Sequence, residues 1–294
     1  MSDYKTLFGK KIKFQTTDLS MSTATEGEVF YSDTDAKFKV GVIVEAWASG
    51  GNMNTARRRL AGAGIQTAAL AISGTADPPL YNQVESYDGS SWTEIADVNT
   101  AREEHAASGT ATAALTFGGK AGSATANTES WNNTSWTEVA NLNTARQELT
   151  GDGATNTAAI AVGGVPNRAI AETWNGTAWT EVADLNTGRA SFAGGAGTTT
   201  SAVVFGGYDP VSGVAESWNG TAWTEVADLN TARGYGGQTA GTSNSSALAI
   251  GGTTGSDQAK TEAYNGTSWR ESSDLAAATV NNAAAGTTAS ALNM

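Results

Sequence analysis

The chain has 294 residues, no Cys, a single His and a net charge of −12. These counts exclude disulfide frameworks, thiolate metal sites, cysteine nucleophiles and metal sites built from two histidines of one chain. No apolar run approaches the roughly 18 residues that span a bilayer and no secretory leader is present, so we expect a protein made in a cytoplasm without membrane insertion.

The first 36 residues form an aromatic N-terminal arm, and the four Lys of the arm all lie within residues 5–13. Residues 1–60 carry nine Lys and Arg against seven acids, whereas residues 61–294 carry eight against 22. The stretch GEVFYSDTDAKFKV (27–40) alternates aromatic and polar residues around a polar turn, which predicts a β-hairpin. We expect the arm to dock on a partner, the alternative being a strand packed on its own domain. The candidate docking residues are Tyr4, Phe8, Lys10, Lys11, Lys13 and Phe14.

From Trp47 onward the chain repeats every 43 to 46 residues, and the stretch WNGTAWTEVADLNT occurs unchanged at 174–187 and 218–231. One landmark is a Trp in each copy: Trp47, Trp92, Trp136, Trp179, Trp223 and Trp269. An Arg follows ten residues after the first five of them: Arg57, Arg102, Arg146, Arg189 and Arg233. Thr279 takes this place in the last copy. Such regularity indicates that both series are structural.

Each repeat is predicted to form four strands. The first follows the Arg, and the second is an apolar run that ends in two glycines, as in ALTFGG (114–119) and AIAVGG (159–164). The third carries a Glu and an aromatic residue, and an Asn-Gly or Asp-Gly type I′ turn leads to the fourth, which begins at the Trp. Repeated four-stranded units of 40–50 residues indicate an all-β propeller.

Counting the repeats predicts six blades. Five start near the repeated Arg residues, and a sixth starts near Thr279 and stops within its second strand. Residues 37–50 are predicted to supply its missing third and fourth strands. The expected domains are therefore an arm, 1–36, and a six-bladed propeller, 37–294, closed by N-terminal strands paired with 279–294.

The repeated side chains suggest two kinds of role. We expect the Arg and one Glu of each repeat to bind each other, with a carbohydrate or cation site as the alternative. The Trp residues are expected to pack blades together rather than to bind sugars. The first aromatic of each hairpin is expected to be partly exposed and is the candidate binding surface: Tyr87, Trp131, Trp174, Trp218 and Tyr264. The divergent loops after the double glycines are a further candidate recognition surface.

No enzyme, metal or cofactor site is predicted. A glycosidase needs two carboxylates in unequal environments, whereas the acids here recur equivalently in the repeats. His105 is expected to be a structural or surface residue. Three lysines in the arm are too few for a nucleic-acid site, so no nucleic-acid partner is expected.

The double glycine, aromatic and Trp pattern resembles the kelch repeat over residues 38–294. The phrase ASGGNMNTAR (48–57) and the Ala-Gly-Thr-rich repeats resemble kelch-like virion proteins of tailed bacteriophages, particularly marine and cyanobacterial ones, and residues 27–40 are similar to N-terminal segments of phage fibre and tail-associated proteins. This resemblance implies a non-enzymatic virion protein on capsid or tail, assembled in the host cytoplasm, that binds other virion proteins through its arm and meets a host receptor or glycan. The alternatives are a bacterial kelch-type protein-binding scaffold and a carbohydrate-binding or carbohydrate-active propeller.

Overall fold

The computed structural model describes residues 13–15, 29–32, 37–40, 46–165, 169–192, 194–236 and 241–294. All regular elements in these ranges are β-strands. The same ranges hold no helix long and apolar enough to cross a membrane. The chain divides into two compact units, Met1–Ala46 and Trp47–Met294.

The first unit contains a small three-stranded sheet. Its strands are β1 (Lys13–Gln15), β2 (Val29–Ser32) and β3 (Lys37–Val40), in the order β1-β2-β3. β2 and β3 are antiparallel and form the hairpin predicted for residues 27–40. β1 runs parallel to β2 and contains the candidate docking residues Lys13 and Phe14. The other candidate docking residues, Tyr4, Phe8, Lys10 and Lys11, lie outside the described residues.

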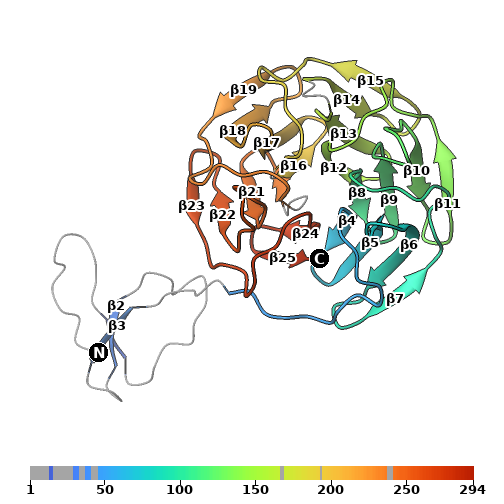
Figure 1. Ribbon diagram of the computed structural model, residues 1–294. Helices are drawn as coiled ribbons and strands as arrows, with labels where there is room; N and C mark the ends of the chain where they lie inside the picture. The colour runs from blue at the N-terminus through green and yellow to red at the C-terminus, as the bar shows by residue number, and fades with distance from the viewer. Residues whose placement is uncertain are drawn as a thin grey trace. The chain divides into compact units, whose positions relative to one another are not determined.

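The second unit is a β-propeller with five four-stranded blades arranged in a ring (Figure 1), and residues of the innermost strands line a central channel. The first strand of each blade is innermost and the fourth is at the outer rim. The blades are β4 (Ala61–Ile65), β5 (Ala68–Thr75), β6 (Leu80–Tyr87) and β7 (Trp92–Ile95); β8 (Ala106–Thr110), β9 (Ala113–Phe117), β10 (Thr128–Trp131) and β11 (Trp136–Val139); β12 (Thr150–Thr155), β13 (Ala158–Val162), β14 (Ala171–Trp174) and β15 (Trp179–Val182); β16 (Gly194–Thr198), β17 (Ser201–Gly207), β18 (Ser212–Trp218) and β19 (Trp223–Val226); and β20 (Gly241–Ser243), β21 (Ser246–Ile250), β22 (Thr261–Tyr264) and β23 (Trp269–Glu271).

The core of the propeller lies between neighbouring blades. The second strand of each blade pairs with a strand on both sides and is covered by a blade on both faces, which is why its sequence is an uninterrupted apolar run. Leu70 and Ile72 of β5, for example, pack with Trp131 and Trp136 of the next blade. The repeat therefore encodes an interface as well as a blade.

The hairpin between the third and fourth strands is present in each blade, but its turn type differs from the prediction. Residues 88–91 form a four-residue loop rather than a two-residue type I′ turn, because Tyr87 pairs with Trp92. The Asp88 carboxylate accepts the N–H groups of Ser90 and Ser91, both at 2.8 Å, and only Gly89 of this loop has a positive φ. The Asp88 side chain thus closes the loop, which lies where the Asp-Gly pair predicted a turn.

The prediction of six four-stranded blades is wrong. The sixth position holds a two-stranded hairpin, β24 (Ala284–Thr287) and β25 (Ser290–Asn293), which packs against the first and fifth blades. β3 pairs with its sequence neighbour β2 instead of completing this blade. Local pairing closes a shorter loop at lower entropic cost. Val40 also stands seven residues before Trp47, where each complete repeat has the Glu that anchors its third strand.

Trp47 nevertheless continues the Trp series into the sixth position. It is half-buried and packs, with Leu275, against the cluster that includes Leu248 and Ala284. The segment after it runs to the first blade, where the indole N–H of Trp92 donates to the carbonyl of Gly51 at 3.0 Å. The segment from Trp47 to the first blade therefore connects the sixth position with the first blade.

Candidate functional site

The repeated Arg and Glu residues form buried ion pairs, as predicted, and each pair lies within one blade. Arg57 and Glu85 are 2.5 Å apart, Arg146 and Glu172 2.9 Å, and Arg189 and Glu216 3.2 Å. Arg102 with Glu129 and Arg233 with Glu262 pair in the same way. These side chains are between 0 and 9% exposed, so the pairs belong to the protein interior.

Each of these Glu residues also holds the linker that arrives from the preceding blade. Asn143 donates its backbone N–H and its Nδ2 to Glu172 Oε2, both at 2.8 Å, and its Nδ2 also donates to the carbonyl of Trp179. At the first blade, burial acts to raise the pKa of Glu85, but hydrogen bonds from Asn54 and Arg57 outweigh it and hold the pKa below its ordinary value. A carboxylate held in this way serves as a structural anchor for the incoming linker.

Two residues beyond each repeated Arg, and beyond Thr279 in the last copy, the backbone forms a closed ring at one mouth of the channel. We call the six residues the mouth ring: Arg59, Glu104, Glu148, Ser191, Tyr235 and Asn281. Their φ angles are all positive, between 50° and 56°. The N–H of each donates to the carbonyl of the ring residue before it, at 2.8 to 3.1 Å, and Arg59 closes the cycle by donating to Asn281. The segment that leads into the two-stranded hairpin thus contributes the sixth member of the ring.

Positive φ is uncommon for residues other than Gly and indicates that the surroundings hold the conformation in place. Here the six hydrogen bonds supply that constraint, so the ring is a fixed frame. The side chains attached to it comprise one cation, two carboxylates, a hydroxyl, a phenol and an amide. Constant backbone geometry with varied side chains is how a repeat scaffold builds a binding site.

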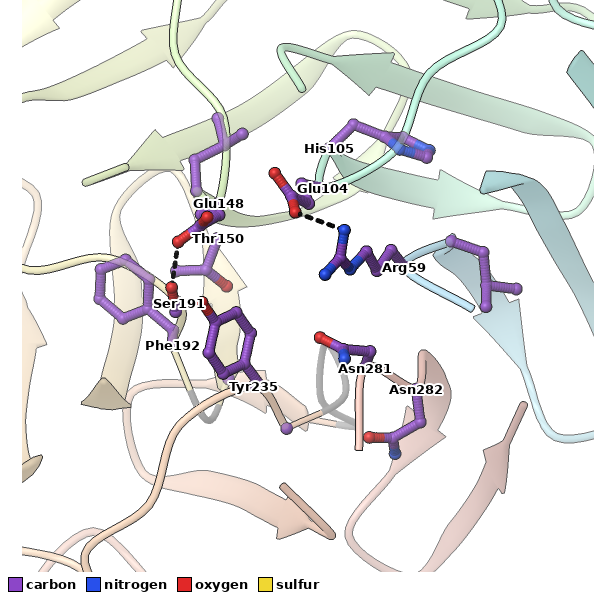
Figure 2. A pocket seen from close by; sticks show the side chains of 14 residues that line it. Arg59, Glu104, His105, Glu148, Thr150, Ser191, Phe192, Tyr235, Asn281 and Asn282 are labelled. Carbon is purple, nitrogen blue, oxygen red and sulfur yellow. Dashed lines mark hydrogen bonds and ion pairs between the residues drawn. The ribbon is translucent and has the colours of Figure 1, made fainter. Parts of the chain in front are cut away.

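The mouth ring opens onto a small pocket of about 70 Å³. Figure 2 shows the side chains that converge on it. The residues that follow the ring positions provide the second layer of its lining: Leu60, His105, Leu149, Phe192, Gly236 and Asn282. The pocket lining therefore combines charged, polar, apolar and aromatic groups.

Charged groups in the mouth ring interact across blade boundaries. Arg59 Nη1 lies 3.0 Å from Glu103 Oε2 and 3.1 Å from Glu104 Oε1. The hydroxyl of Ser191 donates to the carboxylate of Glu148. Burial raises the pKa of Glu104, and the negative charge of Glu148 raises it further, whereas Arg59 acts to lower it. The two ring carboxylates are thus close enough to repel each other.

Two buried polar side chains line the same pocket. Burial lowers the pKa of His105 to about 3, with a further contribution from the positive charge of Arg102, so its imidazole is neutral near pH 7. Thr150 is 3% exposed, and its hydroxyl has no hydrogen-bond partner among the described residues. His105 is therefore a structural lining residue, in line with the sequence-based expectation, and Thr150 offers the pocket a free polar atom.

The loops after the double glycines emerge beside the mouth ring. Backbone bridges join Glu103 to Lys120 and Gly234 to Thr253, which ties each loop start to the residue before a ring position. The rings of Tyr208 and Tyr235 are 5.1 Å apart, so a loop side chain contacts a ring side chain directly. The divergent loops and the varied ring therefore share one face of the propeller, which we call the mouth face.

The other end of the channel is lined by small residues of the innermost strands, and it holds a cavity of about 260 Å³. Asp152 of β12 stands where the first, second and fourth blades have Ala63, Ser108 and Ala196. Its carboxylate accepts the N–H of Gly153 at 2.6 Å and that of Gly197, on the next blade, at 2.8 Å. Burial raises the pKa of Asp152 to about 7, although both hydrogen bonds act to lower it.

The candidate binding surface predicted from the first hairpin aromatics is wrong in its expected exposure. Tyr87, Trp131, Trp174, Trp218 and Tyr264 are only 1 to 6% exposed. Strand alternation turns these residues toward the preceding blade. The ring centroid of each lies 4.9 to 5.6 Å from that of the Trp that begins the fourth strand of its own blade. Both aromatic series therefore pack blades together.

The mouth ring was missed by the sequence reasoning, although a signal for it exists. In the aligned repeats, the position two residues after the Arg, or after Thr279 in the last copy, is Arg, Glu, Glu, Ser, Tyr and Asn in turn. Its two neighbours vary as well, whereas the segment from Trp to Arg hardly changes in the copies that begin at Trp92, Trp136, Trp179 and Trp223. A position that varies inside a conserved repeat unit marks a surface with a specific task.

No protein-family model matches the chain, and no curated protein is significantly similar to it. Among the residues that the structure describes, no group of three His, Cys, Asp or Glu side chains is placed to hold a metal ion.

Proposed function

We propose that this protein is a non-enzymatic recognition scaffold that binds its target with the mouth face. The observation that carries this proposal is the mouth ring, whose six backbone positions are fixed by one cycle of hydrogen bonds while their side chains differ. Divergent loops surround the ring on the same face, as the contact between Tyr208 and Tyr235 illustrates. The remainder of the propeller is a repeated frame that holds this face in place.

The state of the carboxylates favours a scaffold over a carbohydrate-active enzyme. Each repeated buried Glu is bound by an Arg of its own blade, as in the pair of Arg146 and Glu172. In the mouth, Glu104 is paired with Arg59 and Glu148 accepts a hydrogen bond from Ser191. A glycosidase would instead need an acid and a base facing one substrate position across the site.

We further propose that the scaffold is a structural component of a tailed bacteriophage particle. In this proposal residues 1–36 dock on other virion proteins, and the propeller is displayed outward for host adsorption or decoration. The support is the resemblance of the repeats and of residues 27–40 to phage virion proteins, together with the contrast between the net charge of +2 on residues 1–60 and that of −14 on residues 61–294. The second candidate is a bacterial kelch-type scaffold that binds another protein.

Mass spectrometry and cryo-electron microscopy of purified phage particles from marine cyanobacterial hosts test this proposal. We expect the chain among the particle proteins, with propeller density on the capsid or tail and the mouth face directed away from the particle. Recovery of the chain only from lysates of uninfected cells would overturn the virion setting and leave the bacterial scaffold. Density with the mouth face buried against the particle would overturn outward recognition.

A further inference from the structure

We infer that the mouth ring binds the protonated amine of a lysine side chain on a protein partner. This inference rests on the proposed recognition function and names the chemistry of its target. The starting point is Glu148, which lies two residues before the start of β12 and lines the pocket. Among the described residues no cation lies within ion-pair distance of Glu148, and its hydrogen-bond donor is the neutral hydroxyl of Ser191.

The charge distribution around the pocket leaves a place for one more cation. Arg59 is already shared between Glu103 and Glu104, at 3.0 and 3.1 Å, and Lys120 pairs with Glu103 at 3.6 Å. Glu148 and Glu104 repel each other across the boundary between the second and third blades. A positive charge near Glu148 would relieve this repulsion, because opposite charges at short distance stabilise each other in a partly buried site.

The lining of the pocket suits an amine carried on an aliphatic stem. Phe192 and Tyr235 supply aromatic surface near the Glu148 carboxylate (Figure 2), and Leu149 adds an apolar side chain to the lining. Lysine side chains bury their methylene groups on such surfaces, and an aromatic face attracts the ammonium group. A volume of about 70 Å³ admits one such side-chain end, but not a folded segment.

An independent observation also points to a ligand at this position. The Thr150 hydroxyl is nine-tenths buried, lines the pocket and has no partner among the described residues. A buried hydroxyl is ordinarily hydrogen-bonded, and its oxygen can accept from an ammonium N–H. The net charge of −14 on residues 61–294, given by eight Lys and Arg against 22 acids, would attract a basic partner from a distance.

The test compares two probes that differ only in the amine, Nα-acetyl-lysine N-methylamide and Nα-acetyl-norleucine N-methylamide. Both are titrated into the full chain, with binding followed by calorimetry and by saturation-transfer NMR. We expect a Kd on the order of 1 mM for the lysine probe and binding about tenfold weaker or worse for the norleucine probe. Equal binding of the two probes, or binding of neither, would overturn the inference.

Two variants locate the binding in the mouth. Glu148→Gln keeps the shape of the side chain and removes its charge, and we expect it to weaken the lysine probe by about tenfold. Glu181→Gln removes an equivalent charge from the exposed face of β15 and should leave the Kd unchanged. Equal effects of the two variants would reduce the inference to general attraction by an acidic surface and so overturn it. Each variant's thermal unfolding is measured to show that the fold is retained.

The outcome is separable from the proposed function. If the chain is found on phage particles with its mouth face outward but the lysine probe does not bind, only the amine inference fails. If the probe binds but the chain is absent from particles, the mouth is a cation site on a scaffold from another setting.

Discussion

The backbone N–H of Arg59 donates to the carbonyl of Asn281 at 2.8 Å. These two residues belong to the first and the last repeats, 222 positions apart in the numbering, and their hydrogen bond completes the cycle around the channel mouth. The first and last repeats are thereby joined through the same backbone geometry that joins every other pair of neighbours. Closure consequently depends on a residue just before the two-stranded hairpin rather than on a complete sixth blade.

Replacing Asn281 tests this closure. Asn281→Pro removes the N–H that donates to Tyr235 and cannot adopt the positive φ of 56°, so it should lower the free energy of unfolding by about 3 kcal/mol or more. Asn281→Gly keeps the N–H and tolerates this φ, and its effect should stay within about 1 kcal/mol. Urea unfolding of both variants measures the difference. A proline variant as stable as the glycine variant would show that the ring does not contribute to closure.

The buried ion pairs predict strong destabilisation when one partner is lost. Arg146→Met leaves the Glu172 carboxylate buried without its cation and should cost about 3–5 kcal/mol. Arg58→Met removes only a half-exposed ion pair with Asp77 and should change the free energy of unfolding by less than about 1 kcal/mol. Thermal and urea unfolding check both values. If the two variants behaved alike, the recurring pairs could not be anchors of the blades.

The double glycine predicts a steric effect at its first position. In Gly163→Ala the added Cβ would lie 2.6 Å from the carbonyl oxygen of Arg189 and from the ring of Phe192. We expect a loss of about 2–4 kcal/mol in the free energy of unfolding, because backbone and ring must both shift. Gly122→Ala has a similarly positive φ but no atom within 4 Å, so its cost should be about 1 kcal/mol. Comparable unfolding midpoints would contradict a packing role for the double glycine.

Asp152 predicts a pH dependence of stability. Its pKa is about 7 in the folded protein and near 4 in the unfolded chain, so the folded state binds the proton more tightly between these values. Stability contributed by this group is therefore present below about pH 4 and is lost as the pH rises toward 7. Between pH 5 and pH 8 the wild-type protein should lose on the order of 1–3 kcal/mol more than Asp152→Asn. Urea titrations at the two pH values measure this difference, and parallel losses in both proteins would refute it.

The sequence identified the elements whose signals recur. The Trp and Arg positions represented by Trp179 and Arg146 recur in each complete repeat. Their spacing therefore predicted four-stranded blades and the pairing of Arg with Glu. The sixth position was mispredicted because the alternating residues 37–40 (KFKV) fit a propeller strand and a local hairpin equally well by pattern. Residues 37–40 pair with the nearby strand Val29–Ser32 and form the hairpin. Hydrophobic periodicity does not show which of two available strands a segment will pair with.

The site was harder to predict than the fold for a physical reason. Tyr87 and Trp131 flank hairpin turns, which suggested exposure, but burial in a propeller depends on which face of a strand meets the neighbouring blade. The mouth ring comes from six distant positions that meet only around the channel axis. Its signal is the variation at Arg59, Glu104 and the equivalent positions. An inference drawn from the residues that stay constant between repeats does not detect this variation.

The absence of cysteine allows the most direct test of the mouth face as the recognition surface. Ser256→Cys places a single thiol on an exposed loop of the mouth face, and Thr177→Cys places one on an exposed hairpin turn at the other end of the blades. Each is labelled with a bulky maleimide on particles that carry the protein, and the rate of adsorption to host cells is measured. The account predicts that the label at 256 slows adsorption by about tenfold or more, whereas the label at 177 leaves it unchanged. Unchanged adsorption with the label at 256, or a loss confined to the label at 177, would contradict it.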